Sequence, residues 1–196
     1  MARPTTIRTG QILNAARKLF LANGFGASTA DIAREAGVSE GSLFKRFPTK
    51  ADLFRAAMGL PEFHIEEETA SRVGKGNLRD NLARLMDMIL EFHRVLMPRV
   101  MMMWAQPGLS PLEMLKGDPE HNPPQQAMKA LSRYLAGEVE RGRLKPQDTD
   151  VVASMIMSSM HSYVFGEQIG IREKTDEAGW KYIQSVIDVL MEGIAP

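Results

Sequence analysis

The sequence contains no cysteine among its 196 residues. This absence excludes disulfide bonds, thiolate metal sites and a cysteine nucleophile, and it fits a reducing compartment. Long hydrophobic runs are also missing, because the longest purely apolar stretch is the six residues 100–105, whereas a membrane-spanning helix needs roughly 20. The opening stretch MARPTTIRTG carries Arg3 and Arg8 without an apolar segment behind them, so we expect no secretory signal. We therefore expect a cytoplasmic protein without a membrane association.

Net charge is absent overall, since 24 Lys and Arg balance 24 Asp and Glu, but the charge is unevenly distributed. Residues 1–60 hold nine basic and four acidic side chains, a net +5, and residues 61–196 hold 15 basic and 20 acidic ones, a net −5. A basic N-terminal part on an acidic body fits an N-terminal part that faces nucleic acid. Chance scatter of surface charge explains the same numbers equally well.

Strand signals are almost absent, and apolar residues recur at helical spacing throughout the chain. The stretch 61–76 is predicted to be a helix end or a linker, Pro98 is predicted to kink or interrupt a long helix that begins at Leu78, and 107–124 is predicted to be loop. The other predicted helices are 9–23, 28–37, 39–47, 49–60, 125–141, 149–169 and 177–193. The fold class expected from this pattern is all-α.

The segment DIAREAGVSEGSLFKRF, residues 31–47, reads as two short helices joined by roughly three residues. Such a tight connection needs particular residue types. Ala33 is small where the helices come closest, Gly37 tolerates positive φ, and Val38 and Leu43 are expected to face inward. With a helix before it and basic residues after it, the unit has the pattern of a DNA-binding three-helix arrangement, and a generic helical hairpin is the alternative.

The longer stretches ILNAARKLFLANGF and STADIAREAGVSEGSLFKRFPTKADLF closely resemble the N-terminal domain of the tetracycline-repressor (TetR) family of bacterial transcriptional regulators. The resemblance covers about residues 9–58. It implies an N-terminal three-helix bundle with a helix-turn-helix at 1–60. It also implies a C-terminal helical domain at 61–196 that binds a small ligand and dimerises through its last two helices.

A major groove admits one α-helix, and side chains near the N-terminal end of that helix reach the base edges. The candidates for base reading are Ser39, Glu40, Gly41, Ser42 and Lys45. Glu40 can accept a hydrogen bond from a cytosine amino group. Alternatively, Glu40 is a first-turn carboxylate that the helix dipole favours, and this second explanation is the simpler one.

Phosphate contacts fix the position of a protein on DNA without reading its sequence. The candidates are Ser28 and Thr29 at the start of the second helix, together with Arg46 and Lys50. Phe44 is also a candidate residue of the DNA-binding surface. It occupies a position where the TetR family usually has tyrosine, so a phosphate-binding hydroxyl is missing there and only packing remains. The segment before Ser28 is also one residue shorter than the family pattern.

The two last predicted helices carry more apolar surface than one core needs, which favours a subunit interface over a thick monomer core. We therefore expect a homodimer through residues 149–194. A pocket for an uncharged or weakly polar, largely hydrophobic ligand is expected in the C-terminal domain, with His93 and His161 as its candidate polar groups. Its candidate residues are Met86, Ile89, Phe92, His93, Met97, Met101, Trp104, Met128, Leu131, Tyr134, Met157, His161 and Phe165. Ordinary core packing is the simpler explanation for any single one of them.

The expected function is a sequence-specific transcriptional regulator, a repressor that a ligand releases from a pseudo-palindromic operator. An activator or a ligand-independent regulator is the alternative within DNA binding. An enzyme is disfavoured, because the sequence holds no nucleophile motif, phosphate loop or clustered metal ligands, and its four histidines are scattered. A helical interaction protein without a DNA role is the third class. No cofactor or metal is expected.

Overall fold

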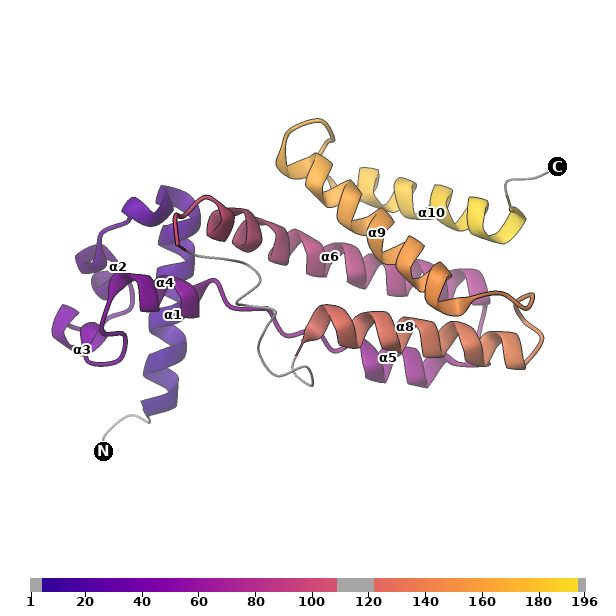
Figure 1. Ribbon diagram of the computed structural model, residues 1–196, viewed down its shortest axis with the longest axis horizontal. Helices are drawn as coiled ribbons and strands as arrows, with labels where there is room; N and C mark the ends of the chain where they lie inside the picture. Colours follow the sequence, from indigo (N-terminus) through magenta and orange to yellow (C-terminus); the bar gives the residue numbers. More distant parts are fainter. Residues whose placement is uncertain (1–4, 109–121, 194–196) are drawn as a thin grey trace. The chain divides into compact units, whose positions relative to one another are not determined.

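The computed structural model describes residues 5–108 and 122–193, with only the backbone described for residues 5–8. All secondary-structure elements in these ranges are helices and none is a strand, so the predicted all-α fold class is confirmed. The elements, labelled in Figure 1, are α1 (Thr5–Asn23), the 3-10 helix η1 (Gly24–Gly26), α2 (Thr29–Glu35), α3 (Glu40–Phe44), α4 (Lys50–Ala57), α5 (Ile65–Arg72), α6 (Leu78–Trp104), α8 (Pro123–Glu140), α9 (Thr149–Gln168) and α10 (Asp176–Glu192).

The chain divides into two compact units. The described residues of unit 1 are 5–60 and 98–108, and those of unit 2 are 61–97 and 122–193. Helix α6 therefore contributes to both units, and the division falls between Met97 and Pro98. The functional assignment of a DNA-binding part and an effector-binding part remains a prediction.

Pro98 does not interrupt α6, which continues to Trp104, so an interruption at this residue is excluded, and a kink there stays a prediction. A proline inside a helix removes one backbone hydrogen bond, and other contacts must stabilise the following turn. Here Met103 is only 1% exposed within the core of unit 1, and Arg99 Nη1 donates to Gly59 O at 2.7 Å. Packing of the last turns of α6 thus compensates for the proline.

The core of unit 1 is a cluster of apolar side chains from α1, α2, α3 and α4, joined by Met103. At its centre, Phe20 and Phe25 each lie edge-on to Phe54, with ring centroids 5.0 and 5.3 Å from the Phe54 ring. Edge-to-face packing of this kind stabilises aromatic clusters beyond the area they bury. This core supports α2, α3 and α4 against α1, as Figure 1 shows at the indigo end of the chain.

Two arginines bind the C-terminal end of α4. Arg17 Nε donates to Ala57 O at 2.8 Å, and Arg99 donates to the next turn at Gly59 O. The carbonyl end of a helix carries partial negative charge, which favours cations. Burial, followed by the nearby Arg17 charge, lowers the pKa of Arg99 to about 10. These contacts fix the end of α4 to both α1 and the last turns of α6.

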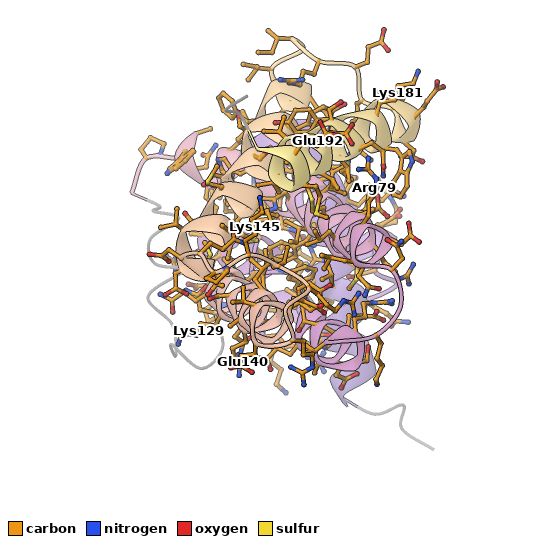
Figure 2. The ribbon with its side chains drawn as sticks, turned by 90° about the vertical axis from the view of Figure 1, so that its right-hand side faces the viewer. Arg79, Lys129, Glu140, Lys145, Lys181 and Glu192 are labelled. Atoms are coloured by element: carbon orange, nitrogen blue, oxygen red, sulfur yellow. The ribbon has the colours of Figure 1, made fainter. Side chains whose placement is uncertain are left out.

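Unit 2 contains α5, α8, α9, α10 and residues 78–97 of α6, with α5 lying beside α8 and α9 beside α10 (Figure 1). The region 61–76, predicted as a helix end or linker, contains the helix α5. Its side chains Ile65 and Thr69 are buried, and Arg72 Nη2 lies 2.5 Å from Glu68 Oε2 one turn earlier. Charged ends of Lys129, Glu140 and Lys181 point outward in Figure 2.

The predicted helix limits differ from those observed by a few residues, as is usual for helix ends. The proline- and glycine-rich stretch 107–124, predicted as loop, lies mostly outside the described residues. Among the described residues, none of the helices combines the length and apolarity that crossing a bilayer requires.

Candidate DNA-binding surface

The turn between α2 and α3 is closed by backbone hydrogen bonds. Gly37 has φ +66, its N–H donates to Arg34 O at 3.1 Å, and the Val38 N–H donates to Ala33 O at 3.0 Å. This pair of bonds is the Schellman arrangement, in which a left-handed residue follows the C-cap of a helix, here Ala36. The predicted positive φ of Gly37 is confirmed, and a β-carbon there would strain the backbone.

The inward side of this helical pair is apolar, as the sequence predicts. Leu43 is fully buried, Ala33 is 3% exposed, and Val38 packs partly buried against the same core. Because α3 has only five residues, its position depends on this packing and on its N-cap more than on its own helical propensity. The side chains of α3 on either side of Leu43 are consequently left at the surface.

Hydroxyl side chains cap the helices of this region. Ser28 Oγ accepts from the Asp31 N–H at 3.4 Å, and Ser39 Oγ accepts from the Ser42 N–H at 3.2 Å. Thr49 and Asp52 form a full capping box at the start of α4. These caps satisfy backbone donors that have no partner within their helix, and they fix where α2, α3 and α4 begin.

All five predicted base-reading residues are exposed on or beside α3: Ser39, Glu40, Gly41, Ser42 and Lys45. Two of them bond to each other, with the Ser39 and Ser42 hydroxyl oxygens 2.8 Å apart. A β-carbon built on Gly41 would meet no atom within 4 Å. The structure thus brings these residues together on one short stretch of surface, and their contacts with DNA remain a prediction.

The predicted phosphate-binding residues have partners within unit 1. Thr29 Oγ1 donates to Glu40 Oε1 at 2.6 Å, and Arg46 Nη1 donates to Thr9 Oγ1 on α1 at 2.8 Å. Lys50 Nζ lies 5.1 Å from the centroid of the Phe25 ring, a distance at which a cation and an aromatic face attract each other. The Thr29–Glu40 and Arg46–Thr9 bonds were not expected from the sequence, because their partners are eleven and 37 residues apart and no local pattern links them.

Phe44, which stands where a tyrosine hydroxyl was expected from the resemblance, is 37% exposed at the end of α3. Of the surface cations nearby, Lys18, Arg34 and Arg55 are paired with the acids Glu35, Asp31 and Asp52. Among the described residues, no carboxylate lies within 4.0 Å of Lys45, Arg46 or Lys50. The charge of these three cations is therefore not neutralised by a direct ion pair in this part of the chain.

Most of the candidate ligand-pocket residues are core residues. Met101 and Trp104 belong to unit 1, and the others belong to unit 2. Eight are buried: Met86, Ile89, Phe92, His93, Met97, Leu131, Tyr134 and Met157. Met101 and Met128 are partly buried, and Trp104, His161 and Phe165 are exposed. The pocket remains a prediction.

His93 and His161 lie against each other with their ring centroids 5.6 Å apart and their planes nearly perpendicular. The Nδ1–H of His93 donates to Ile89 O at 2.8 Å. Loss of hydration lowers the pKa of both imidazoles, which favours their neutral forms, although the His93 side chain is buried and that of His161 is only partly shielded from water. These two candidate polar groups, one from α6 and one from α9, are therefore adjacent within unit 2.

Tyr134 lines a groove of about 480 Å³ between α5 and α8. Burial, followed by the nearby Glu138 carboxylate, raises the pKa of Tyr134 to about 12. Arg133 Nη2 and Glu66 Oε1, on opposite sides of the groove, are 2.9 Å apart. The described residues hold no group of three or more His, Asp or Glu side chains that could bind a metal ion.

A second groove, of about 340 Å³, lies between α9 and α10. Its lining is mainly apolar and consists of Met155, Ile156, Ser159, Tyr182, Ser185, Val186, Val189 and Leu190. Met155 and Val189 are 55% and 51% exposed, although large apolar side chains are usually buried. The two last helices thus leave apolar surface uncovered within the described protomer.

Residues 12–57 match the model of a family described as bacterial regulatory proteins, tetR family. The nucleoid occlusion factor SlmA of Aliivibrio fischeri (strain MJ11) is 39% identical over 82 residues, which are 40% of this chain and 40% of that protein. The chain therefore matches less than half of that relative's length.

Solved structures resemble the whole fold. One from Mesorhizobium loti, assigned to the TetR family of transcriptional regulators, has a TM-score of 0.75 and 14% identity, with 97% of this chain and 98% of that one covered. Another, from Saccharomonospora viridis, is named as a transcriptional regulator and was solved in complex with choline. It has a TM-score of 0.68 and 17% identity, and 97% of each chain is covered. At these identities the likeness establishes the fold alone.

Proposed function

We propose that this chain, which belongs to the TetR family of bacterial regulatory proteins, is a DNA-binding transcriptional regulator that represses genes by occupying a pseudo-palindromic operator. The proposal includes release from the operator by a small, largely hydrophobic ligand. It assigns no catalytic role to the protein. An activator, or a regulator without a ligand, is the alternative within the same family.

The observation that carries the proposal is the exposed face of α3. A short helix held by a tight turn against a core, with Ser39, Gly41, Ser42 and Lys45 outward, has the chemistry that major-groove reading requires. Hydroxyls and a lysine can exchange hydrogen bonds with base edges, and a glycine lets the backbone approach closely. Lys45, Arg46 and Lys50 supply positive charge that no acid within 4.0 Å neutralises among the described residues. Such charge is suited to phosphates.

We propose that two protomers associate through α9 and α10. Support comes from the exposed apolar side chains Val151, Met155, Phe165 and Val189 on these helices and Ile169 directly after α9. A second copy that covers them would remove apolar area from water, which is the main favourable contribution to most protein association. A two-fold dimer would present two α3 helices to successive major grooves about 34–36 Å apart, or a multiple of that distance.

We propose that the effector is bound in unit 2, near the adjacent pair His93 and His161. Two mainly neutral imidazoles among apolar side chains would suit a ligand that is uncharged or weakly polar. The choline complex of the Saccharomonospora viridis protein supports small-molecule binding by this fold. Any ligand can shift the protein only by its difference in affinity for the DNA-bound and released states.

The test begins with protected sites on genomic DNA from the source organism and continues with affinities for a randomised operator panel. Lys50→Ala should weaken binding to every sequence alike, whereas Ser42→Ala and Lys45→Ala should change the preferred bases. A uniform loss for all three variants would contradict the base-reading assignment. Absence of salt-sensitive binding to any duplex would contradict the DNA-binding function itself.

A further inference from the structure

The first turn of α3 contains a feature that is unusual for a surface meant to approach DNA, namely the carboxylate of Glu40. This side chain is exposed, and its Oε1 accepts the Thr29 hydroxyl proton at 2.6 Å. Glu40 opens α3 and Thr29 opens α2, so the bond links the starting residues of the two helices of the pair. The orientation of the Glu40 carboxylate is therefore restricted.

The charge of Glu40 is not neutralised by a direct ion pair. Among the described residues, no Lys or Arg nitrogen lies within 4.0 Å of this carboxylate, although Asp31, Glu35 and Asp52 of the same unit each have such a partner. A negative charge here repels phosphates and the acceptor atoms of guanine and thymine. Favourable contact requires a donor, which cytosine N4 and adenine N6 supply in the major groove. Cytosine is favoured over adenine, because the N7 acceptor beside adenine N6 repels a carboxylate.

Thr29 adds a second consequence. Its hydroxyl is used by Glu40, so the same proton cannot be donated to a phosphate while that bond lasts. A hydroxyl to carboxylate bond has an ionised acceptor, and such bonds are stronger than neutral ones. The predicted role of Thr29 as a phosphate contact therefore competes with its role in holding Glu40.

We propose that Glu40, held by Thr29, is a specificity-determining residue of this protein: it selects a cytosine amino group in each half-site and penalises all other DNA by repulsion. This inference rests on the proposed function, because it assumes that α3 enters the major groove. Specificity is a difference between affinities, and a repulsive group sharpens it by weakening the wrong complexes more than the right one.

The experiment compares wild-type protein, Glu40→Ala and Glu40→Gln on a library with randomised operators and on a non-operator duplex of equal length. Wild type should select cytosine at one position of each half-site. Glu40→Gln should select adenine there, because a glutamine amide pairs with the adenine edge, and Glu40→Ala should select no base. Glu40→Ala should also bind the non-operator duplex more tightly and lower the ratio of operator to non-operator affinity by about tenfold, as expected for one lost base contact.

A double-mutant cycle tests the role of Thr29. Thr29→Val removes the hydroxyl of the side chain but keeps its shape. In the wild-type background it should weaken the preference for cytosine, and in the Glu40→Ala background it should leave the base preference at the same operator position unchanged. If Thr29→Val lowers affinity equally for all sequences in both backgrounds, Thr29 is a phosphate contact and the coupling is wrong. Thermal unfolding of each variant verifies that the helical pair remains folded.

Glu35→Gln is the matched control, since it neutralises another exposed acid of the same unit, one that pairs with Lys18 at 2.6 Å. It should leave the base preferences unchanged. Unchanged base preferences in both Glu40 variants, with wild type still binding its operator, would overturn the inference while leaving the proposed function intact. Failure of the wild type to bind duplex DNA would overturn both.

Discussion

Arg94 on α6 and Glu167 on α9 form a bidentate ion pair inside unit 2, with Nη2 2.6 Å from Oε1 and Nε 3.1 Å from Oε2. The Glu167 side chain is fully buried and that of Arg94 is 8% exposed. The hydrogen bond to Glu167 raises the pKa of Arg94 above its ordinary value, so the guanidinium stays charged. Arg94 also donates to Thr175 O, which joins the loop before α10 to the same pair.

Removing one partner of this buried pair should destabilise the protein strongly. Glu167→Ala leaves the Arg94 charge without its main partner and with only the exposed acids Glu91 and Asp176, so we expect a loss of roughly 3 kcal/mol in the free energy of unfolding, the lower end of the range for a broken buried pair. Urea denaturation at a fixed protein concentration measures it. Glu177→Ala is the control, because the Glu177–Lys181 pair is mostly exposed and screened by water. Equal effects of the two substitutions would contradict the structural role of Glu167.

A charge introduced on the exposed face of α9 and α10 should dissociate the proposed dimer. Val189→Glu places a carboxylate beside the 340 Å³ groove, and burying it without a partner should weaken association by roughly a hundredfold or more. Sedimentation velocity across a concentration series measures this. Val95→Glu is the matched control, since Val95 on α6 is similarly exposed at 47%. A wild-type protein that is monomeric throughout the series would contradict the interface.

Replacing Gly41 separates stability from DNA binding. An alanine β-carbon there meets no atom within 4 Å, and alanine favours the helical state over glycine by about 0.5–1 kcal/mol. Gly41→Ala should therefore raise the free energy of unfolding. It should also weaken operator binding by roughly tenfold, the size of one lost base contact, because its methyl group would keep the backbone of α3 from approaching the groove closely. Thermal unfolding and a gel-shift titration measure the two effects.

The control for this substitution is Gly10→Ala on α1, where an added β-carbon also meets nothing within 4 Å. Gly10 is not among the predicted contact residues, so this variant should gain stability and retain its affinity for DNA. Unchanged operator affinity of Gly41→Ala would show that the backbone of α3 does not approach the groove closely at this residue.

The buried histidine of α6 should make stability depend on pH. Burial lowers the pKa of His93 below 6.5, so the folded protein binds fewer protons than the unfolded chain below that pH. The stability that the neutral His93 imidazole contributes is fully present above its pKa of 6.5 in the unfolded chain. It is lost progressively as the pH falls toward the lower pKa of His93 in the folded protein. The neighbouring His161, whose pKa is also lowered, acts in the same direction.

Urea midpoints at pH 7.5 and 5.5 measure this effect. His93→Gln should reduce the difference between the two midpoints, whereas His64→Gln, at an exposed position, should leave it unchanged. A wild-type midpoint that is equal or higher at pH 5.5 would contradict a role for the buried imidazole.

Local sequence determined much of unit 1. The apolar spacing and Gly37 are short-range features that predicted the helices of this unit and the turn between α2 and α3, and the equally local caps formed by Ser28, Ser39 and Thr49 fix where α2, α3 and α4 begin. The same kind of signal placed Glu40 and Lys45 at the surface of α3. Helix periodicity and caps act between residues within a few positions of each other, so they can be read from the sequence alone.

Only the tertiary structure decided which distant groups meet. Arg94 and Glu167 are 73 residues apart, the last turns of α6 continue past Pro98 because they pack in the core of unit 1, and Thr29 binds Glu40 rather than pointing freely outward. Local propensity does not encode these contacts, because they depend on how completed helices pack against one another. The sequence by itself therefore determined the all-α class, the helices of unit 1 and the exposed residues of α3. Packing decided what the local patterns missed, namely the continuation of α6 past Pro98 and the side-chain pairs between distant helices.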